Sequence, residues 1–169
     1  MMDAQIETPR LLLRHFVEED LDALAGLMAN ADFMRYSSGV FSREETARFL
    51  FDRVIEPVRA GCPSQFALIS REENRLLGYC GFFRQIVDAH EEIEIGYRLD
   101  PACWNRGLAT EAARAVRAYA SDVLKLPRVI SLIHPDNYAS RRVAEKNGMA
   151  LEKETTFRGS PVLVFVYRE

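Results

Sequence analysis

Glu92-Ile-Glu-Ile-Gly-Tyr-Arg-Leu-Asp-Pro-Ala-Cys-Trp-Asn-Arg-Gly-Leu-Ala-Thr-Glu111 is the stretch in which this chain changes its hydrophobic period. Up to Leu99, apolar side chains alternate with polar or small ones, which is the two-residue period of a β-strand. After Pro101, apolar side chains recur every three or four residues, which indicates a helix from near Gly107 to about Lys125. The stretch therefore predicts a strand, a tight loop and a helix.

Two features of this stretch indicate a functional site. The exposed amides and the dipole of a helix N-terminus favour a phosphate group, and Gly107 and Ala109 leave the backbone open to close approach. Glu92 and Glu94 lie two residues apart and so share one face of the predicted strand. We therefore hypothesise a carboxylate-bearing strand that feeds an anion-binding helix.

The composition fits one compact domain. The 169 residues are 48% hydrophobic, enough for a sizeable core, and no linker or repeat divides residues 1–169. A formal net charge of -3 argues against a dedicated nucleic-acid binder. No segment approaches the ~20 apolar residues of a membrane-spanning helix, and Met1–Thr8 contains no apolar run typical of a signal peptide. We expect a cytoplasmic protein without a nucleic-acid or membrane partner.

The three cysteines indicate neither a disulfide framework nor a zinc site. Cys62, Cys80 and Cys103 are odd in number and widely spaced, without the paired spacing of zinc ligands. We expect reduced thiols that serve as small core residues, and no metal.

Periodicity and turn residues predict the order β, α, α, β, β, β, α, β, α, β, β, which is an α/β (α+β) pattern. The middle three consecutive strands are expected to form an antiparallel meander, the strands on either side of the third helix a parallel pair, and the last two strands a hairpin. Strands are predicted at 11–13, 65–70, 76–84, 92–99, 129–133, 151–157 and 162–167, and helices at 18–30, 42–60, 107–125 and 137–147.

Three motifs, taken together in their order and spacing, resemble one family. They are Ile6-Glu-Thr-Pro-Arg-Leu-Leu-Leu-Arg14, Trp104-Asn-Arg-Gly-Leu-Ala-Thr-Glu111 and Asn137-Tyr-Ala-Ser-Arg-Arg-Val-Ala-Glu-Lys-Asn-Gly148. The chain resembles the GNAT acetyltransferase superfamily, specifically the branch of the ribosomal-protein N-terminal acetyltransferases. The resemblance implies a mixed, mostly antiparallel sheet of six to seven strands with a central parallel pair, flanked by four helices. It also implies an N-acetyltransferase that moves an acetyl group from acetyl-CoA to a primary amine by direct attack on the thioester.

The resemblance further implies where acetyl-CoA binds. The family's pyrophosphate loop has the form Gln/Arg-x-x-Gly-x-Gly/Ala, and here Trp104 replaces its first residue. Backbone groups of Tyr97 and Leu99 would bind the pantetheine, with the Tyr97 amide on the thioester carbonyl. Asn137 and Ser140 match the branch's Asn-x-x-Ser on the opposite wall, and they also fit a helix cap. The pyrophosphate would be held by the amides of Asn105, Arg106, Gly107, Leu108, Ala109 and Thr110.

The catalytic residues follow from the chemistry of amines. An alkylammonium of pKa ~10.4 has no lone pair, so a base, directly or through water, helps to deliver the neutral amine. Glu94 or Glu92 is the candidate base, and the alternative is that one or both form ion pairs with Arg98 or Arg84.

The residue that assists the leaving thiolate is less clearly marked. Many family members carry a Tyr seven residues after the Asn, but here that position is Ala144. Ser140 becomes the candidate partner of the thiolate, and the Tyr97 amide the candidate oxyanion donor. Ala144 also motivates the alternative of a non-catalytic acyl-CoA-binding module. For Arg141, Arg142 and Lys146 a solvated helix face is expected, with the CoA phosphates as the alternative role.

The acceptor and the oligomeric state stay open at this point. A protein or peptide N-terminus and a small amine are both compatible with the motifs, and a homodimer through the edge of the C-terminal hairpin is an option.

Overall fold

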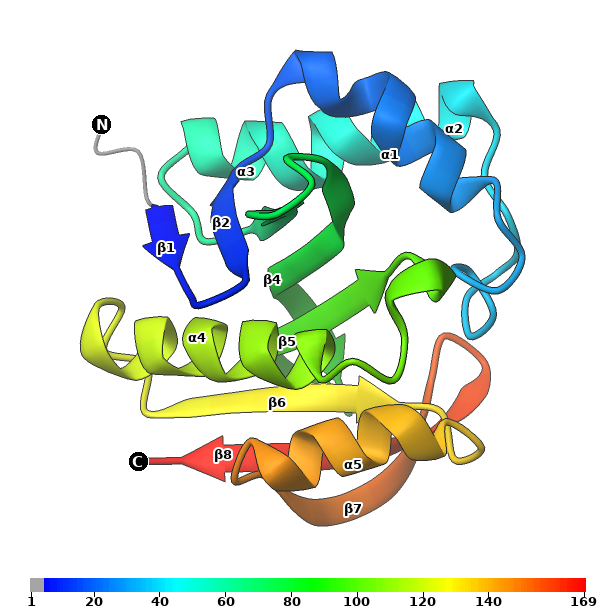
Figure 1. The fold of residues 1–169 in the computed structure, drawn as a ribbon. Coiled ribbons are helices and arrows are strands. Elements are labelled where there is room, and N and C mark those ends of the chain that lie inside the picture. The colour runs from blue at the N-terminus through cyan, green and yellow to red at the C-terminus, as the bar shows by residue number, and fades with distance from the viewer. Residues whose placement is uncertain (1–4) are drawn as a thin grey trace.

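The computed structural model describes residues 5–169, and Met1–Ala4 lie outside the described part. The described strands form one eight-stranded sheet in the order β1-β2-β3-β4-β5-β6-β8-β7 (Figure 1). The strands are β1 (Gln5–Glu7), β2 (Leu11–His15), β3 (Gln65–Ser70), β4 (Leu76–Val87), β5 (His90–Leu99), β6 (Arg128–Ile133), β7 (Ala150–Phe157) and β8 (Ser160–Arg168).

Four helical segments pack on the sheet. One segment is continuous from α2 to α3 but contains a turn of π-helix, Phe49–Ile55, in its middle. The helices are α1 (Leu21–Met28), α2 (Arg43–Arg48), α3 (Glu56–Arg59), α4 (Leu108–Asp122) and α5 (Tyr138–Lys146). In Figure 1, α4 and α5 cover one face of the sheet, and α1 to α3 pack toward the other. In the described residues, no helix is long and apolar enough to cross a membrane.

Alternation along β5 assigns its two faces. Ile95 and Leu99 are buried in the core that includes Leu108, Ala112 and Val116 of α4. The intervening positions, Glu94 and Gly96 among them, belong to the opposite face, where α1 and the π-turn cover a second core. The period that predicts the strand therefore also separates its apolar face from its carboxylate face.

The sheet contains one parallel junction, at β5 and β6. All other neighbouring strands are antiparallel, and the register recorded between β5 and β6 is a single pair, Glu94 with Ile130. Beyond it, the Ser131 hydroxyl donates to the Ile95 carbonyl at 2.8 Å in place of a backbone donor. In the described residues no backbone pairing continues from there to Leu99, so this edge of β5 faces open space.

The predicted fold class is confirmed, with one more strand than expected. The meander, the parallel pair and the C-terminal hairpin are all present. The eighth strand is β1, which pairs Gln5 with Arg14 of β2. Its three residues are too short to show a hydrophobic period, so the pattern of the sequence does not identify it. The cysteines are free thiols, with Cys80 and Cys103 buried and Cys62 half-buried.

Candidate active site

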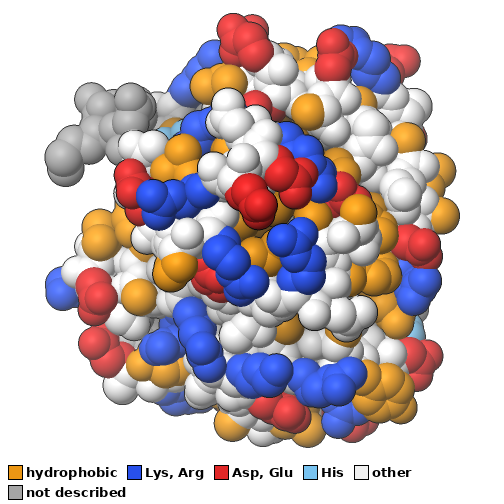
Figure 2. Space-filling view, in the orientation of Figure 1, with side chains coloured by type: hydrophobic (Ala, Val, Ile, Leu, Met, Phe, Trp, Pro, Cys, Tyr) orange, Lys and Arg blue, Asp and Glu red, His pale blue; other side chains and the backbone are white. Residues whose placement is uncertain are grey.

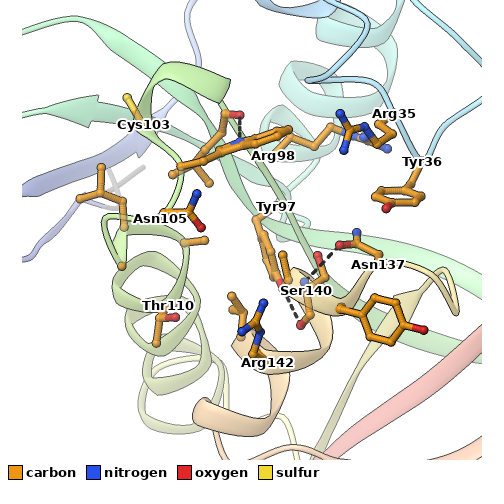
Figure 3. Close-up of a pocket in the computed structure, with 18 of the residues that line it drawn as sticks. Arg35, Tyr36, Tyr97, Arg98, Cys103, Asn105, Thr110, Asn137, Ser140 and Arg142 are labelled. Atoms are coloured by element: carbon orange, nitrogen blue, oxygen red, sulfur yellow. Dashed lines mark hydrogen bonds between the residues drawn. The ribbon is translucent and has the colours of Figure 1, made fainter.

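A cavity of about 560 Å³ lies where β5 and β6 separate, between the N-terminal ends of α4 and α5 (Figure 3). Most residues predicted to bind the cofactor line it, whereas Arg106, Glu92 and Glu94 do not. The lining residues among those predicted are Tyr97, Leu99, Asn105, Gly107, Leu108, Ala109, Thr110, Asn137 and Ser140. Three segments that are far apart in the sequence therefore meet at one cavity.

The loop before α4 turns sharply so that the helix N-terminus meets the cavity. Asn105 has φ +60° and Gly107 has φ +77°, both in the left-handed region that glycine tolerates best. Trp104 lines the cavity before this turn, and its indole Nε1 donates to the Leu99 carbonyl at 2.9 Å. The Asp100 side chain accepts from the Ala102 amide at 3.0 Å and so fixes the 3₁₀ turn Pro101–Cys103, which precedes Trp104. The result is a helix start whose first amides face the cavity.

The segment before β2 holds this helix start from behind. Glu111, in the first turn of α4, accepts from the Thr8 hydroxyl at 2.6 Å, the Arg10 amide at 2.9 Å and the Arg10 Nε at 2.7 Å. The same guanidinium donates through Nη1 to the Arg106 carbonyl at 2.7 Å. Burial alone raises the pKa of Glu111, but these hydrogen bonds outweigh it and hold the pKa below its usual range. We call Thr8, Arg10 and Glu111 the helix clamp.

The wall opposite α4 is the N-terminus of α5. The Asn137 side chain caps this helix by accepting from the Ser140 amide at 3.1 Å, so the predicted cap is confirmed. The Tyr97 hydroxyl crosses from β5 and donates to the Ser140 carbonyl at 3.2 Å, as Figure 3 shows. Burial raises the pKa of the Tyr97 phenol, which therefore stays protonated. Ala144 is buried against Ile133 and Leu163, with 2% of its surface exposed, and so presents no polar group to the cavity.

The loop between α1 and α2 lies across the cavity and contacts both walls. The Arg35 guanidinium is 5.8 Å from the centre of the Trp104 ring, on the α4 side. Tyr36 stacks on His134 with 5.3 Å between the ring centres, and its hydroxyl donates to the Asp136 carbonyl at 3.3 Å, on the α5 side. Sequence periodicity does not identify these contacts, because the loop has no regular repeat and each partner lies about 70 to 100 residues away.

The two glutamates of β5 have different surroundings. Glu92 accepts from Arg128 of β6, with oxygen to Nη2 and Nε distances of 2.9 and 3.0 Å, and that arginine also pairs with Glu152. An ion pair of Glu92 is thus present, but the expected partners were wrong. Arg98 donates instead to the Phe33 carbonyl and Arg84 pairs with Glu91. The actual partner comes from the strand after the crossover helix, 36 residues away, so proximity in sequence did not indicate it.

Glu94 is the glutamate without a strong cationic partner. Its carboxylate accepts from the Gln85 Nε2 at 2.8 Å, and in the described residues it forms no ion pair. Burial raises the pKa of this carboxyl, and the hydrogen bonds from Gln85 and the Leu132 amide, with the charges of Arg158 and Arg98, offset only part of that shift. Glu94 shares its face with Gly96, where a side chain would press on the Phe83 ring at 3.3 Å. The carboxylate face of β5 is therefore lined by Glu94, Gly96 and Phe83.

Comparisons with known proteins agree on one family. A family model for the acetyltransferase (GNAT) domain matches residues 10–150. The chain is 32% identical over 148 residues to the uncharacterized N-acetyltransferase YnaD of Bacillus subtilis, covering 87% of this chain and 83% of that protein. Among solved structures, an acetyltransferase (GNAT family) from Bacillus anthracis has a TM-score of 0.82 at 30% identity, over 98% of each chain. RimL, a ribosomal L7/L12 alpha-N-protein acetyltransferase in complex with coenzyme A, shares the fold with a TM-score of 0.79 at 21% identity, over 98% of each chain.

Proposed function

We propose that this chain, which belongs to the GNAT acetyltransferase family, transfers the acetyl group of acetyl-CoA to a primary amine by direct attack of the amine on the thioester. One observation carries the proposal. The unpaired edge of β5 and the N-terminal turn of α4 open into the same cavity, so one extended ligand with a hydrogen-bonding arm and a phosphate group fits both. Acetyl-CoA has this chemistry, and proteins with this fold use it.

The proposed cofactor site has two parts. The pyrophosphate lies on the amides of Asn105 to Thr110, where helix dipole and unsatisfied donors favour an anion. The pantetheine lies along Tyr97 to Leu99 and takes the hydrogen-bonding place that β6 leaves after Glu94, with Asn137 and Ser140 on the opposite wall. The left-handed conformation of Gly107 supports this placement, because it lets the backbone turn toward the ligand.

Glu94, rather than Glu92, is the proposed base. Glu92 is engaged by Arg128 in an ion pair with only 14% of the glutamate side chain exposed, so its carboxylate is occupied by that arginine. Burial raises the pKa of Glu94, which makes its carboxylate a better proton acceptor near neutral pH. Tyr97 lies three positions after Glu94, about 10 Å along a strand, so water molecules relay the proton. The amine approaches from the face of β5 where Gly96 has no side chain.

The acyl transfer then proceeds with a balanced exchange of bonds. The amine nitrogen attacks the thioester carbon, the oxyanion accepts a hydrogen bond from the Tyr97 amide, and the amine's proton passes through water to Glu94. The carbon–sulfur bond breaks and CoA leaves as a thiolate of pKa ~8.5, which can depart without an acid. Ser140, which lines the cavity, is the proposed hydrogen-bond donor to this sulfur.

The acceptor is proposed only as a class: a protein or peptide N-terminus, or a small amine. An acetyl-CoA-dependent screen against peptides and small amines tests the function. Acetylated product from any of them, with loss of turnover in Glu94→Gln, supports the enzyme. The alternative, a non-catalytic acyl-CoA-binding module, rests on Ala144 and predicts CoA binding with no product from any acceptor.

A further inference from the structure

Most cationic side chains of this protein have a partner, and the exceptions are not evenly spread. The chain has 22 Lys and Arg residues, all within the described part. Among them, those without a hydrogen bond, ion pair or ring contact are Arg48, Arg106, Lys125, Arg142 and Lys146. Arg142 and Lys146 line the cavity, and Arg106 belongs to the loop at its α4 end. Two of these five unpaired cations thus line the cavity described above, and a third belongs to the adjoining loop, in a chain with net charge -3.

Arg142 and Lys146 are placed to act together. They lie four residues apart on α5, so their side chains share one face of the helix with Cβ atoms about 5–6 Å apart. Figure 3 shows Arg142 extending from α5 into the space between α5 and α4, with Thr110 on the α4 side. Arg114 of α4 donates to the Lys146 carbonyl at 3.1 Å, which joins the two helices at this end and adds a third cation. In Figure 2, blue side chains gather over α4 and α5 on this face.

We propose that Arg142 and Lys146 form a subsite for the ribose 3′-phosphate of CoA. This inference rests on the proposed function and adds residues that distinguish CoA from a cofactor without the 3′-phosphate. CoA carries a pyrophosphate and a separate phosphate monoester, and the amides at the start of α4 serve only the pyrophosphate. The monoester carries a charge of about -1.5 to -2 at neutral pH, which two converging cations match. The guanidinium supplies a planar pair of donors and the ammonium a point charge.

The neighbouring Arg141 provides a matched control. It lies on the same helix, but its guanidinium is 5.3 Å from the centre of the Tyr138 ring and it does not line the cavity. A general loss of positive charge on α5 would affect Arg141 and Arg142 variants alike. A dedicated subsite affects only the Arg142 and Lys146 variants.

The test compares the binding of acetyl-CoA with that of acetyl-dephospho-CoA, which lacks only the 3′-phosphate, by calorimetry. The wild-type protein should prefer acetyl-CoA by about 5- to 30-fold, the range expected of exposed charge-assisted contacts. Arg142→Gln with Lys146→Gln should reduce the preference to about 1- to 2-fold and leave the affinity for acetyl-dephospho-CoA unchanged, whereas Arg141→Gln should keep the preference. Gln is a good helix former, so the helix is retained, and circular dichroism checks this.

Three outcomes overturn the subsite while leaving the proposed function intact. Equal wild-type affinity for the two ligands means that the 3′-phosphate has no subsite. Equal loss of both ligands in the double variant places the two cations on the pyrophosphate. Unchanged preference in the double variant removes these residues from recognition. Failure of the wild-type protein to bind either ligand overturns the proposed function itself, and this inference with it.

Discussion

Replacing Arg10 by Ala should weaken the binding of acetyl-CoA, although Arg10 lies nearly a hundred residues before the cofactor loop in the sequence. Arg10 contributes two side-chain hydrogen bonds to the helix clamp, Nε to Glu111 at 2.7 Å and Nη1 to the Arg106 carbonyl at 2.7 Å. Ala removes both, while the Thr8 hydroxyl and the residue 10 amide still donate to Glu111. The carboxylate then remains in the first turn of α4 without its cation.

The size of the effect follows from the exposure of the Arg10 side chain and from the distance between Glu111 and the proposed pyrophosphate site. A hydrogen bond to a charged group contributes about 1.5–3 kcal/mol when buried, but the Arg10 side chain is 47% exposed, so about 1 kcal/mol for each bond is appropriate. The free energy of unfolding should fall by about 1–2 kcal/mol. The uncompensated charge of Glu111 lies one helical turn, about 5–6 Å, from the proposed pyrophosphate amides and repels the ligand. The KM for acetyl-CoA should therefore rise by about 5- to 20-fold.

The assay is steady-state kinetics with varied acetyl-CoA, paired with thermal unfolding. Arg43→Ala is the matched control, because Arg43 donates through Nε to Asp22 at 2.9 Å, and neither residue belongs to the helix clamp or lines the cavity. Adding Glu111→Gln to Arg10→Ala should restore much of the affinity if charge repulsion dominates. An Arg10→Ala protein with wild-type KM and wild-type melting temperature would refute the role of the helix clamp.

Three further substitutions separate the roles of nearby residues. Burial raises the pKa of Glu94, so the native state binds the carboxyl proton more tightly than the unfolded chain does. The free energy of unfolding therefore falls as the pH rises from the ordinary carboxyl pKa through the raised one, by about 1.4 kcal/mol for each unit of difference between the two pKa values. Glu94→Gln should remove that fall in pH-dependent denaturant unfolding while lowering kcat by about 10²-fold, and a wild-type kcat would assign Glu94 a structural role. Glu92→Gln leaves the Arg128 guanidinium with only Glu152, so the free energy of unfolding measured by chemical denaturation should fall by about 1–3 kcal/mol, while kcat stays within about 3-fold. A loss of kcat larger than that of Glu94→Gln would reverse the assignment of the base. Gly107→Val places a β-branched residue at φ +77°, so the affinity for acetyl-CoA, measured by calorimetry, should fall at least about 10-fold in a protein that still folds. Unchanged affinity would contradict the placement of the pyrophosphate.

The sequence predicted the central elements because their patterns are local. The alternation before Leu99 and the helical period after Gly107 each depend on neighbouring residues, and the crossover between them requires a parallel partner strand. The start of α4 near Gly107 and the cap by Asn137 follow from the same local patterns, whereas the binding loop from Asn105 to Thr110 was predicted from the family resemblance. β1 was not predicted, because a strand of three residues is too short to show a hydrophobic period.

Side-chain partners across the sheet could not be predicted in the same way. The pairing of Glu92 with Arg128 depends on the register of β5 against β6, which one residue of slip would abolish. The contact of Arg10 with Glu111 spans 101 residues and depends on how the N-terminal segment meets α4. The motif around Arg10 marked the family, but only the fold connects that arginine to the cofactor loop.

Acetyl transfer itself is the most direct measurement of the proposed function. The protein would be incubated with isotope-labelled acetyl-CoA and a mixed panel of peptides and small amines, and the products identified by mass spectrometry alongside release of free CoA thiol. The mechanism predicts at least one amine that carries the label, in one-to-one ratio with the released thiol, and much less of it with Glu94→Gln. Binding of acetyl-CoA without labelled amine from any acceptor, or thiol release without transfer, would contradict it.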